Sequence, residues 1–161
     1  ALQIMPRLLS RALVKTGETH DALILVATSG DTGKAALEGY KDIERIKIAV
    51  FYPENGVSRV QKLQMQTQTG DNVYVCAING NFDDAQTGVK KIFTDNAYAK
   101  ELDEKGYSLS SANSINWGRL VPQIVYYFSA YCDMLKAEEI QPGEEINVCV
   151  PTSLSIVKNN S

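Results

Sequence analysis

Apolar residues gather in five short runs, which are separated by longer stretches of mixed polarity. The runs are rich in Val, Ile and Ala without strict alternation, a composition typical of strands that are covered on both faces. They predict strands over residues 22–27, 46–51, 73–78, 107–112 and 146–150. The run at 107–112 (YSLSSA) is the least apolar, and it is included because it falls in series with the others.

The stretches around and between these runs carry helical periodicity. They predict helices over residues 2–15, 32–41, 58–68, 83–105 and 119–136. A gap that holds a helix can join parallel strands, whereas a hairpin would need only a few residues. The sequence therefore predicts an α/β fold, with an open, mostly parallel sheet and helices on both faces in three αβα layers.

The length of 161 residues suits one domain, which is expected to occupy residues 1–150. Residues 151–161 are largely polar and are expected to form a C-terminal stub outside that domain. The chain starts at Ala1, inside the first predicted helix and without a capping residue before it. It is therefore expected to be an internal piece of a longer protein.

Composition and charge exclude several classes of function. The formal charge is −3, from 16 basic and 19 acidic residues, and no basic stripe points to nucleic acid as a partner. No apolar run approaches the roughly 20 residues that span a bilayer, so no membrane association is expected. A metal site is not expected either, because His20 is the single histidine and no Cys-x-x-Cys pair occurs. Three cysteines without a disulfide pattern predict a reducing compartment, taken here as the cytoplasm.

The first candidate site is the segment 28–34 (TSGDTGK), between a predicted strand and a predicted helix. Free N–H groups at a helix start, together with the helix dipole, can bind a carboxylate or a phosphate. The alternative is a plain turn in which Ser29 or Asp31 caps the helix. A phosphate-binding P-loop would need Gly at Thr28 and Ser or Thr at Ala35, and the spacing of Gly30 and Gly33 does not fit a dinucleotide fingerprint. Nucleotide binding is thus disfavoured.

The second candidate site combines Ser114, Asn116 and Arg119, again just before a predicted helix. A guanidinium with a hydroxyl and an amide suits a phosphate dianion, because arginine forms paired, charge-assisted hydrogen bonds. The alternative is that Asn116 caps the helix and Arg119 is a solvated surface residue.

Three stretches in the same order resemble threonine synthase, a pyridoxal-phosphate enzyme of fold-type II. They are 27–36 (ATSGDTGKAA), 52–65 (YPENGVSRVQKLQM) and the Ser-x-Asn-x-x-Arg pattern within 113–119, and the likeness covers essentially residues 1–152. The resemblance implies that the substrate carboxylate is bound by Ser29, Gly30 and Thr32. It further implies that Asp31 lies near the cofactor ring, and that the phosphate of O-phosphohomoserine is held by Ser114, Asn116 and Arg119.

The implied reaction is that of a lyase, which converts O-phosphohomoserine and water into threonine and phosphate. In the family, a lysine binds the cofactor within a Phe-Lys-Asp-x-Ala-Leu-Gln motif, of which Ala1-Leu2-Gln3 match only the end. The lysine is expected upstream of Ala1. Pro151-Thr152 match the lead into the turn for the cofactor phosphate, but Ser153-Leu154-Ser155 replace its Gly-Asn-Phe-Gly continuation.

The chain is therefore expected to carry substrate-binding loops, to lack both anchors of the cofactor, and to be inactive without the remainder of the enzyme. It is also expected to expose apolar surface that leads to self-association. The alternative from another functional class is a non-catalytic module that binds phosphate or an amino acid.

Overall fold

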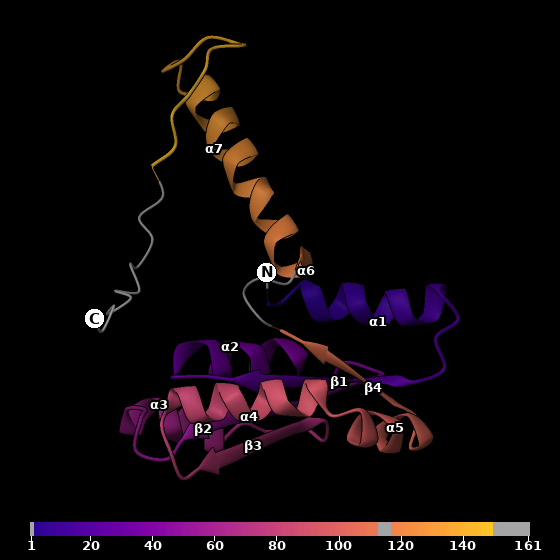
Figure 1. Cartoon of the computed structure of the whole chain (residues 1–161). Coiled ribbons are helices and arrows are strands. Elements are labelled where there is room, and N and C mark those ends of the chain that lie inside the picture. The colour runs from indigo at the N-terminus through magenta and orange to yellow at the C-terminus, as the bar shows by residue number, and fades with distance from the viewer. Residues whose placement is uncertain (1, 113–116, 150–161) are drawn as a thin grey trace, which may run out of the picture. The chain divides into compact units, whose positions relative to one another are not determined.

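The computed structural model describes residues 2–112 and 117–149, and it divides into two units, residues 1–123 and 124–161. The first unit holds a four-stranded sheet in the order β3-β2-β1-β4 (Figure 1). Every neighbouring pair is parallel. The strands are β1 (Asp21–Ala27), β2 (Ile46–Pro53), β3 (Val73–Ile78) and β4 (Tyr107–Ser111). The predicted α/β class is confirmed.

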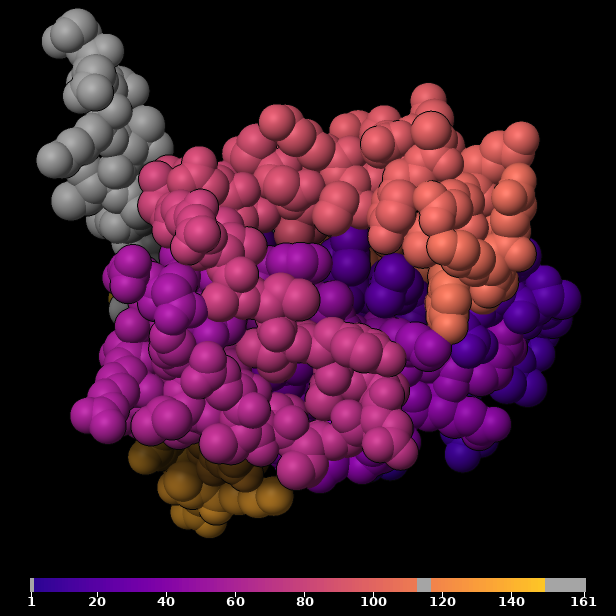
Figure 2. All heavy atoms as spheres, turned by 90° about the horizontal axis from the view of Figure 1, so that it is seen from below, coloured from indigo at the N-terminus to yellow at the C-terminus, as the bar shows by residue number. Residues whose placement is uncertain are grey.

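The helices lie on both faces of this sheet (Figure 1). One layer contains α1 (Met5–Lys15), α2 (Asp31–Tyr40) and α3 (Arg59–Gln66). The opposite face carries α4 (Phe82–Thr94), against β1 and β2, and α5 (Asn96–Glu104), against β4. Figure 2 looks onto that second face, with α4 and α5 in pink to orange and β3 in magenta.

The order in which strands are added to the sheet reverses beside β1. From β1 the chain steps outward to β2 and β3, and α4 and α5 then carry it back across the other face to β4. The parallel strands on either side of this reversal, β1 and β4, are hydrogen-bonded neighbours, with Leu25 opposite Ser111. In open α/β sheets, a ligand crevice forms at the carboxyl ends of the strands at such a reversal.

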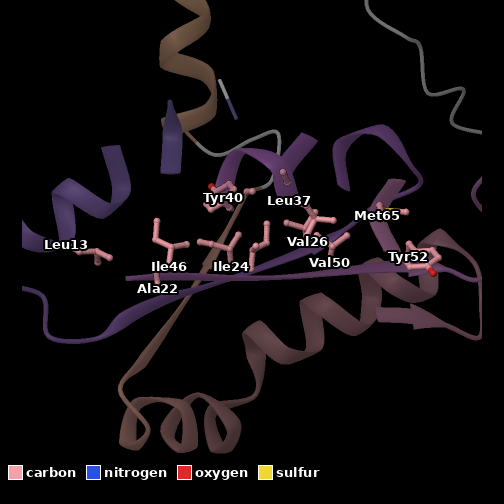
Figure 3. Packing of buried hydrophobic residues seen from close by; sticks show 13 residues of the cluster. Leu13, Ala22, Ile24, Val26, Leu37, Tyr40, Ile46, Val50, Tyr52 and Met65 are labelled. Atoms are coloured by element: carbon pink, nitrogen blue, oxygen red, sulfur yellow. The ribbon is translucent and has the colours of Figure 1, made fainter. Parts of the chain in front are cut away.

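The hydrophobic core fills the space between the sheet and the α1–α3 layer (Figure 3). Ile24, Ile48 and Val50 project from the strands and are fully buried, and Leu37 and Met65 meet them from the helices. This core explains the apolar runs in the sequence, because burying a side chain of this size stabilises the fold by about 1.5–3 kcal/mol.

Local capping sets where the helices begin, and it corrects one prediction. Residues 83–105 form two helices and not one, because the carboxylate of Asp95 accepts hydrogen bonds from the N–H groups of Ala97 and Tyr98 and so caps a new helix. Ser58 and Gln61 form a reciprocal capping box at the start of α3.

Two further predictions are corrected. Residues 119–136 divide into a short helix α6 (Trp117–Leu120), a 3-10 turn η1 (Val121–Gln123) and α7 (Ile124–Lys136). Pro122 lies in that turn, and proline has no N–H for a helical hydrogen bond. The predicted strand at 146–150 is wrong over 146–149, and Val150 lies outside the described residues. That run pairs with no described strand and Val148 is 53% exposed, so apolar character alone did not make it a strand.

Over the described residues, no helix is both long and apolar enough to cross a membrane. Within the same residues, no three His, Cys, Asp or Glu side chains gather in a way that could hold a metal ion.

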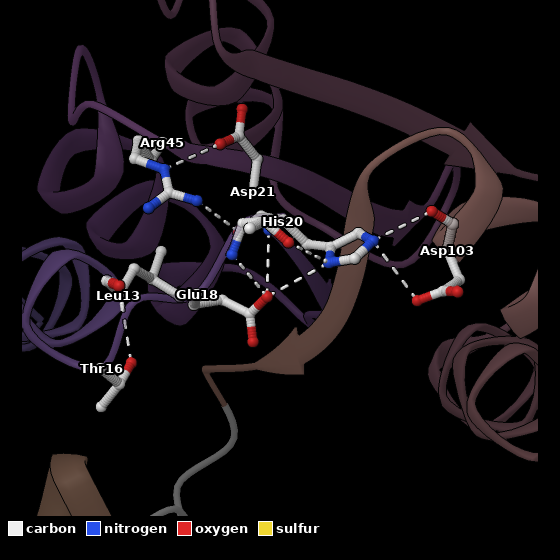
Figure 4. A network of polar contacts seen from close by, with 8 residues as sticks. Leu13, Thr16, Glu18, His20, Asp21, Arg45 and Asp103 are labelled. Atoms are coloured by element: carbon white, nitrogen blue, oxygen red, sulfur yellow. Dashed lines mark hydrogen bonds and ion pairs between the residues drawn. The ribbon is translucent and has the colours of Figure 1, made fainter.

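His20 takes part in a polar network at the amino end of β1 (Figure 4). Its ring nitrogens lie 3.1 Å from a carboxylate oxygen of Glu18 and 3.1 Å from the carbonyl oxygen of Asp103. The Glu18 carboxylate raises the pKa of His20, and hydrogen bonds from His20, first from its backbone N–H, lower the pKa of Glu18. The network joins the loop before β1 to the end of α5, at the amino ends of the strands.

We expect the network to stabilise the protein most in mildly acidic solution. The pKa of His20 is higher in the folded than in the unfolded state, so its contribution is complete below about pH 6.5 and is lost as the pH rises through the folded value. His20→Gln should therefore lower the melting temperature more at pH 5.5 than at pH 8. Lys15→Gln, at an exposed site, is the control. Equal losses at both pH values would contradict the prediction.

The Tyr40 hydroxyl in the core has no hydrogen-bond partner among the residues that the structure describes. Burial raises the pKa of Tyr40 to about 12, and the charge of Arg119 opposes that rise. Tyr40→Phe should raise the free energy of unfolding by about 1 kcal/mol, because it removes a buried polar group that is unsatisfied. Urea denaturation measures the change.

Tyr52→Phe is the matched control for this substitution. The Tyr52 hydroxyl is equally buried, but it accepts a hydrogen bond of 2.9 Å from the side-chain amide of Gln66. Its removal should lower the free energy of unfolding by about 1 kcal/mol. If both substitutions lowered the free energy of unfolding, the Tyr40 hydroxyl would be shown to have a hydrogen-bond partner in solution.

Candidate functional site

A cavity of about 490 Å³ opens beside the carboxyl ends of β1 and β4, at the reversal of the chain. One wall is formed by the end of β1, the loop after it and the end of β4, and another wall by one face of α4. The lining includes Ser29, Thr32, Gln86, Lys90, Phe93 and Arg119.

The loop after β1 is held by the hydroxyl of Thr28, whose side chain is buried. This oxygen accepts hydrogen bonds from the N–H groups of Gly30, at 3.0 Å, and Gly33, at 2.9 Å. It also lies 3.2 Å from the carbonyl oxygen of Gly30, to which it donates. Thr28 was not among the predicted site residues, although a threonine just before a helix start is a signal for this role.

Neither Ser29 nor Asp31 caps α2, so the plain-turn alternative is wrong. The residue at the cap position is Gly30, which has no side chain, and Thr28 satisfies the N–H of Gly33. Ser29 is exposed and lines the cavity, and Thr32, in the first turn of α2, lines it too. The hydroxyls of both residues are thus placed where a ligand could reach them.

The backbone conformation at Gly30 favours glycine, and the residue lies close to the side chain of Gln61 on α3. Its φ of +150° is one that residues with a side chain rarely adopt, and a Cβ there would lie 2.5 Å from the side-chain nitrogen of Gln61. That amide donates a hydrogen bond of 2.7 Å to the Asp31 carboxylate. The stretch 52–65, singled out in the sequence, is therefore joined to the loop after β1. Gln61 was missed, but the Ser-x-x-Gln capping pattern could have revealed it.

Arg119 reaches the cavity from α6. It is half-buried, and its guanidinium donates a hydrogen bond of 3.1 Å to the carbonyl oxygen of Ala112, just after β4. The alternative of a fully solvated surface arginine is therefore wrong. Ser114 and Asn116 lie outside the described residues. Of the predicted residues, the structure brings Ser29, Thr32 and Arg119 to one cavity, whereas Gly30 and Asp31 do not line it.

The face of α4 is the part of the cavity that the sequence did not reveal. Five of its residues line the hollow at helical spacing: Phe82, Gln86, Val89, Lys90 and Phe93. Lys34, at the end of the first candidate segment, does not line it. Lys34 instead lies 3.3 Å from the Glu38 carboxylate and donates a hydrogen bond to Gln68.

The charged side chains among the described lining residues are all positive. It contains Lys90 and Arg119, and none of the described lining residues is an aspartate or a glutamate. Hydroxyl groups and a side-chain amide complete the polar set, and aromatic and aliphatic side chains make up the rest. Such a set can bind a small anion.

Comparison with known proteins shows what the chain resembles. No family model matches the chain. The human protein named threonine synthase-like 1 is 43% identical over 158 residues, which cover 94% of this chain and 21% of the relative. Threonine synthase from Pseudomonas aeruginosa is 48% identical over 130 residues, which cover 81% of this chain and 26% of the relative.

The chain is homologous to a part of the threonine synthases. A crystal structure of PLP-bound threonine synthase from Brucella melitensis superposes with a TM-score of 0.74 and 40% identity, covering 86% of this chain and 28% of the other. The chain thus spans about a fifth to a quarter of the curated threonine synthase relatives that it matches. Its likeness to a solved threonine synthase confirms the fold.

We expect the Thr28 hydroxyl to determine the order of the loop after β1. Thr28→Val keeps the shape of the side chain but removes the acceptor of the Gly30 N–H and one of the two acceptors of the Gly33 N–H, whose other acceptor is the Gly30 carbonyl oxygen. It should lower the free energy of unfolding by about 2 kcal/mol. The amides of Gly30 and Gly33 should then exchange hydrogen faster than in the parent protein. Thr28→Ser retains the hydroxyl and should retain most of the protection. Unchanged exchange in Thr28→Val would contradict the assignment.

Proposed function

We propose that the protein containing this chain converts O-phosphohomoserine and water into threonine and phosphate, and that the chain supplies the substrate-binding loops. One observation carries the proposal. Ser29, Thr32 and Arg119, from segments that resemble those of threonine synthase, line one cavity at the carboxyl ends of β1 and β4. The relatives named above support the family of the reaction.

The β1–α2 loop binds the substrate carboxylate in this proposal. The hydroxyls of Ser29 and Thr32, together with the positive end of the α2 dipole, favour a negative group at that position. Because Thr28 fixes the backbone of the loop, the donors are arranged before the substrate arrives. Arg119 takes the opposite end of the substrate, where its planar guanidinium matches the oxygens of a phosphate. Ser114 and Asn116 are proposed to assist it.

The cofactor of this family, pyridoxal phosphate, supplies an electron sink for carbanion chemistry when it is bound. The described residues fit one side of such a group. One oxygen of Asp31 accepts a hydrogen bond from Gln61, and the second oxygen remains to accept one from a ring hydroxyl. We propose that the lysine and the phosphate-binding turn belong to the remainder of the enzyme. The 161 residues alone should form no threonine.

We propose that the residues of this chain contribute only binding and exclusion of water. The apolar side chains of Phe82 and Val89 shield one wall of the cavity. A shielded site strengthens the attraction between Arg119 and a phosphate, since hydrogen bonds to charged groups gain strength as water is excluded.

Arg119→Ala, made in the complete enzyme, tests the proposal. The loss of a charge-assisted phosphate contact should reduce kcat/KM for O-phosphohomoserine by the equivalent of about 1.5–3 kcal/mol, mainly through KM. Steady-state release of phosphate measures this. Arg119→Lys should recover part of the loss, because it keeps the charge without the paired donors.

Arg59→Ala is the matched control, since Arg59 is exposed on α3 and does not line the cavity. Its kinetics should equal those of the parent enzyme. An Arg119→Ala enzyme with parental KM would remove Arg119 from the substrate site. Binding of phosphohomoserine without any threonine formation by the complete protein would favour a non-catalytic binding module.

A further inference from the structure

We propose that Lys90 on α4 is a second cationic contact for the phosphate group of the substrate, opposite Arg119. The inference rests on the proposed function and adds to it a specificity-determining residue from a helix that carries no recognised motif. Its basis is the position of Lys90 on the cavity wall and the charge balance of that cavity.

The position of Lys90 follows from the crossover that returns the chain to β4. Helix α4 packs against β1 and β2, and its positions 82, 86, 89, 90 and 93 share the face that lines the cavity. Lys90 belongs to this face, and its ammonium nitrogen lies 3.4 Å from the side-chain oxygen of Gln86, which lines the cavity as well. Gln86 can thus orient Lys90 without neutralising it.

The net positive charge of the described lining residues favours a bound anion. Neither Lys90 nor Arg119 has a carboxylate oxygen within 4.0 Å among the described residues, although the chain as a whole is acidic. Six of the nine other lysines that the structure describes have a carboxylate oxygen within 4.0 Å, and Lys15, Lys47 and Lys91 do not. Lys34, Lys62 and Lys105, for example, are paired with a glutamate. Two unpaired cations that face one hollow repel each other, and a bound anion removes that repulsion.

A phosphate ester fits this balance better than a singly charged group. It carries about −1.5 to −2 charge at pH 7, and its three terminal oxygens can accept hydrogen bonds from two cations at once. A carboxylate carries one negative charge, and it would leave one of the two cations without compensation. Lys90 should therefore favour substrates with a phosphorylated leaving group over analogues with a neutral or singly charged one.

The experiment compares Lys90→Met with Lys91→Met in the complete enzyme. Lys91 is the adjacent exposed residue of α4, and it does not line the cavity. Inorganic phosphate is the probe, with its dissociation constant measured by calorimetry at low ionic strength. Lys90→Met should weaken phosphate binding by about tenfold and raise KM for O-phosphohomoserine by a similar factor, with little change in kcat.

Lys91→Met should match the parent enzyme in both measurements, and Lys90→Arg should retain most of the phosphate affinity. The dependence of phosphate affinity on salt should be shallower for Lys90→Met, because one charge is lost. Circular dichroism confirms that each variant is folded. If Lys90→Met unfolds, Lys90→Gln provides the same comparison.

The outcomes separate this inference from the proposed function. If Arg119→Ala weakens phosphate binding and Lys90→Met does not, the assignment of Lys90 is overturned while the proposed function stands. If neither substitution alters phosphate binding and the enzyme forms no threonine, both proposals fail. If both substitutions weaken binding of the probe and Lys91→Met has no effect, the two-cation site is established.

Discussion

The site depends on one buried hydroxyl. Thr28 accepts the N–H groups of Gly30 and Gly33 and donates to the carbonyl oxygen of Gly30, so all of its hydrogen-bonding capacity is used inside the loop. A buried polar group without such partners would lower the stability of the fold by about 1–3 kcal/mol. This arrangement also affects Ser29. Its side chain does not cap the helix, and it is exposed at the cavity.

The sheet then determines which loops can share a ligand. Because β4 pairs with β1 and not with β3, the segments after the first and the last strand meet at the same edge. The return crossover also brings α4 over the central strands, where one of its faces becomes a cavity wall. A different strand order would separate Arg119 from Ser29, whatever their side chains.

Much of this arrangement could be predicted from the sequence. Apolar runs identified the four strands, although only β1 and β2 contain buried residues, and the motifs pointed to Ser29, Thr32 and Arg119. The run at 146–150 was wrongly predicted as a strand, because composition indicates apolar character but does not show whether a neighbouring strand is present for pairing. The break at Asp95 was missed since a capping carboxylate competes with helix continuation only through local hydrogen bonds. Lys90 could not be found, because its role arises from where the crossover places α4.

The bond between Gln61 and Asp31 has a broader consequence for how substitutions in this chain would combine. Gln61 completes the cap of α3 and, through the same amide group, holds the carboxylate that follows Gly30. A single side chain, Gln61, thus contributes both to the stability of α3 and to the orientation of the Asp31 carboxylate. Replacements at positions 30, 31 and 61 should be non-additive in their effects, and evolutionary change at any one of them is constrained by the other two.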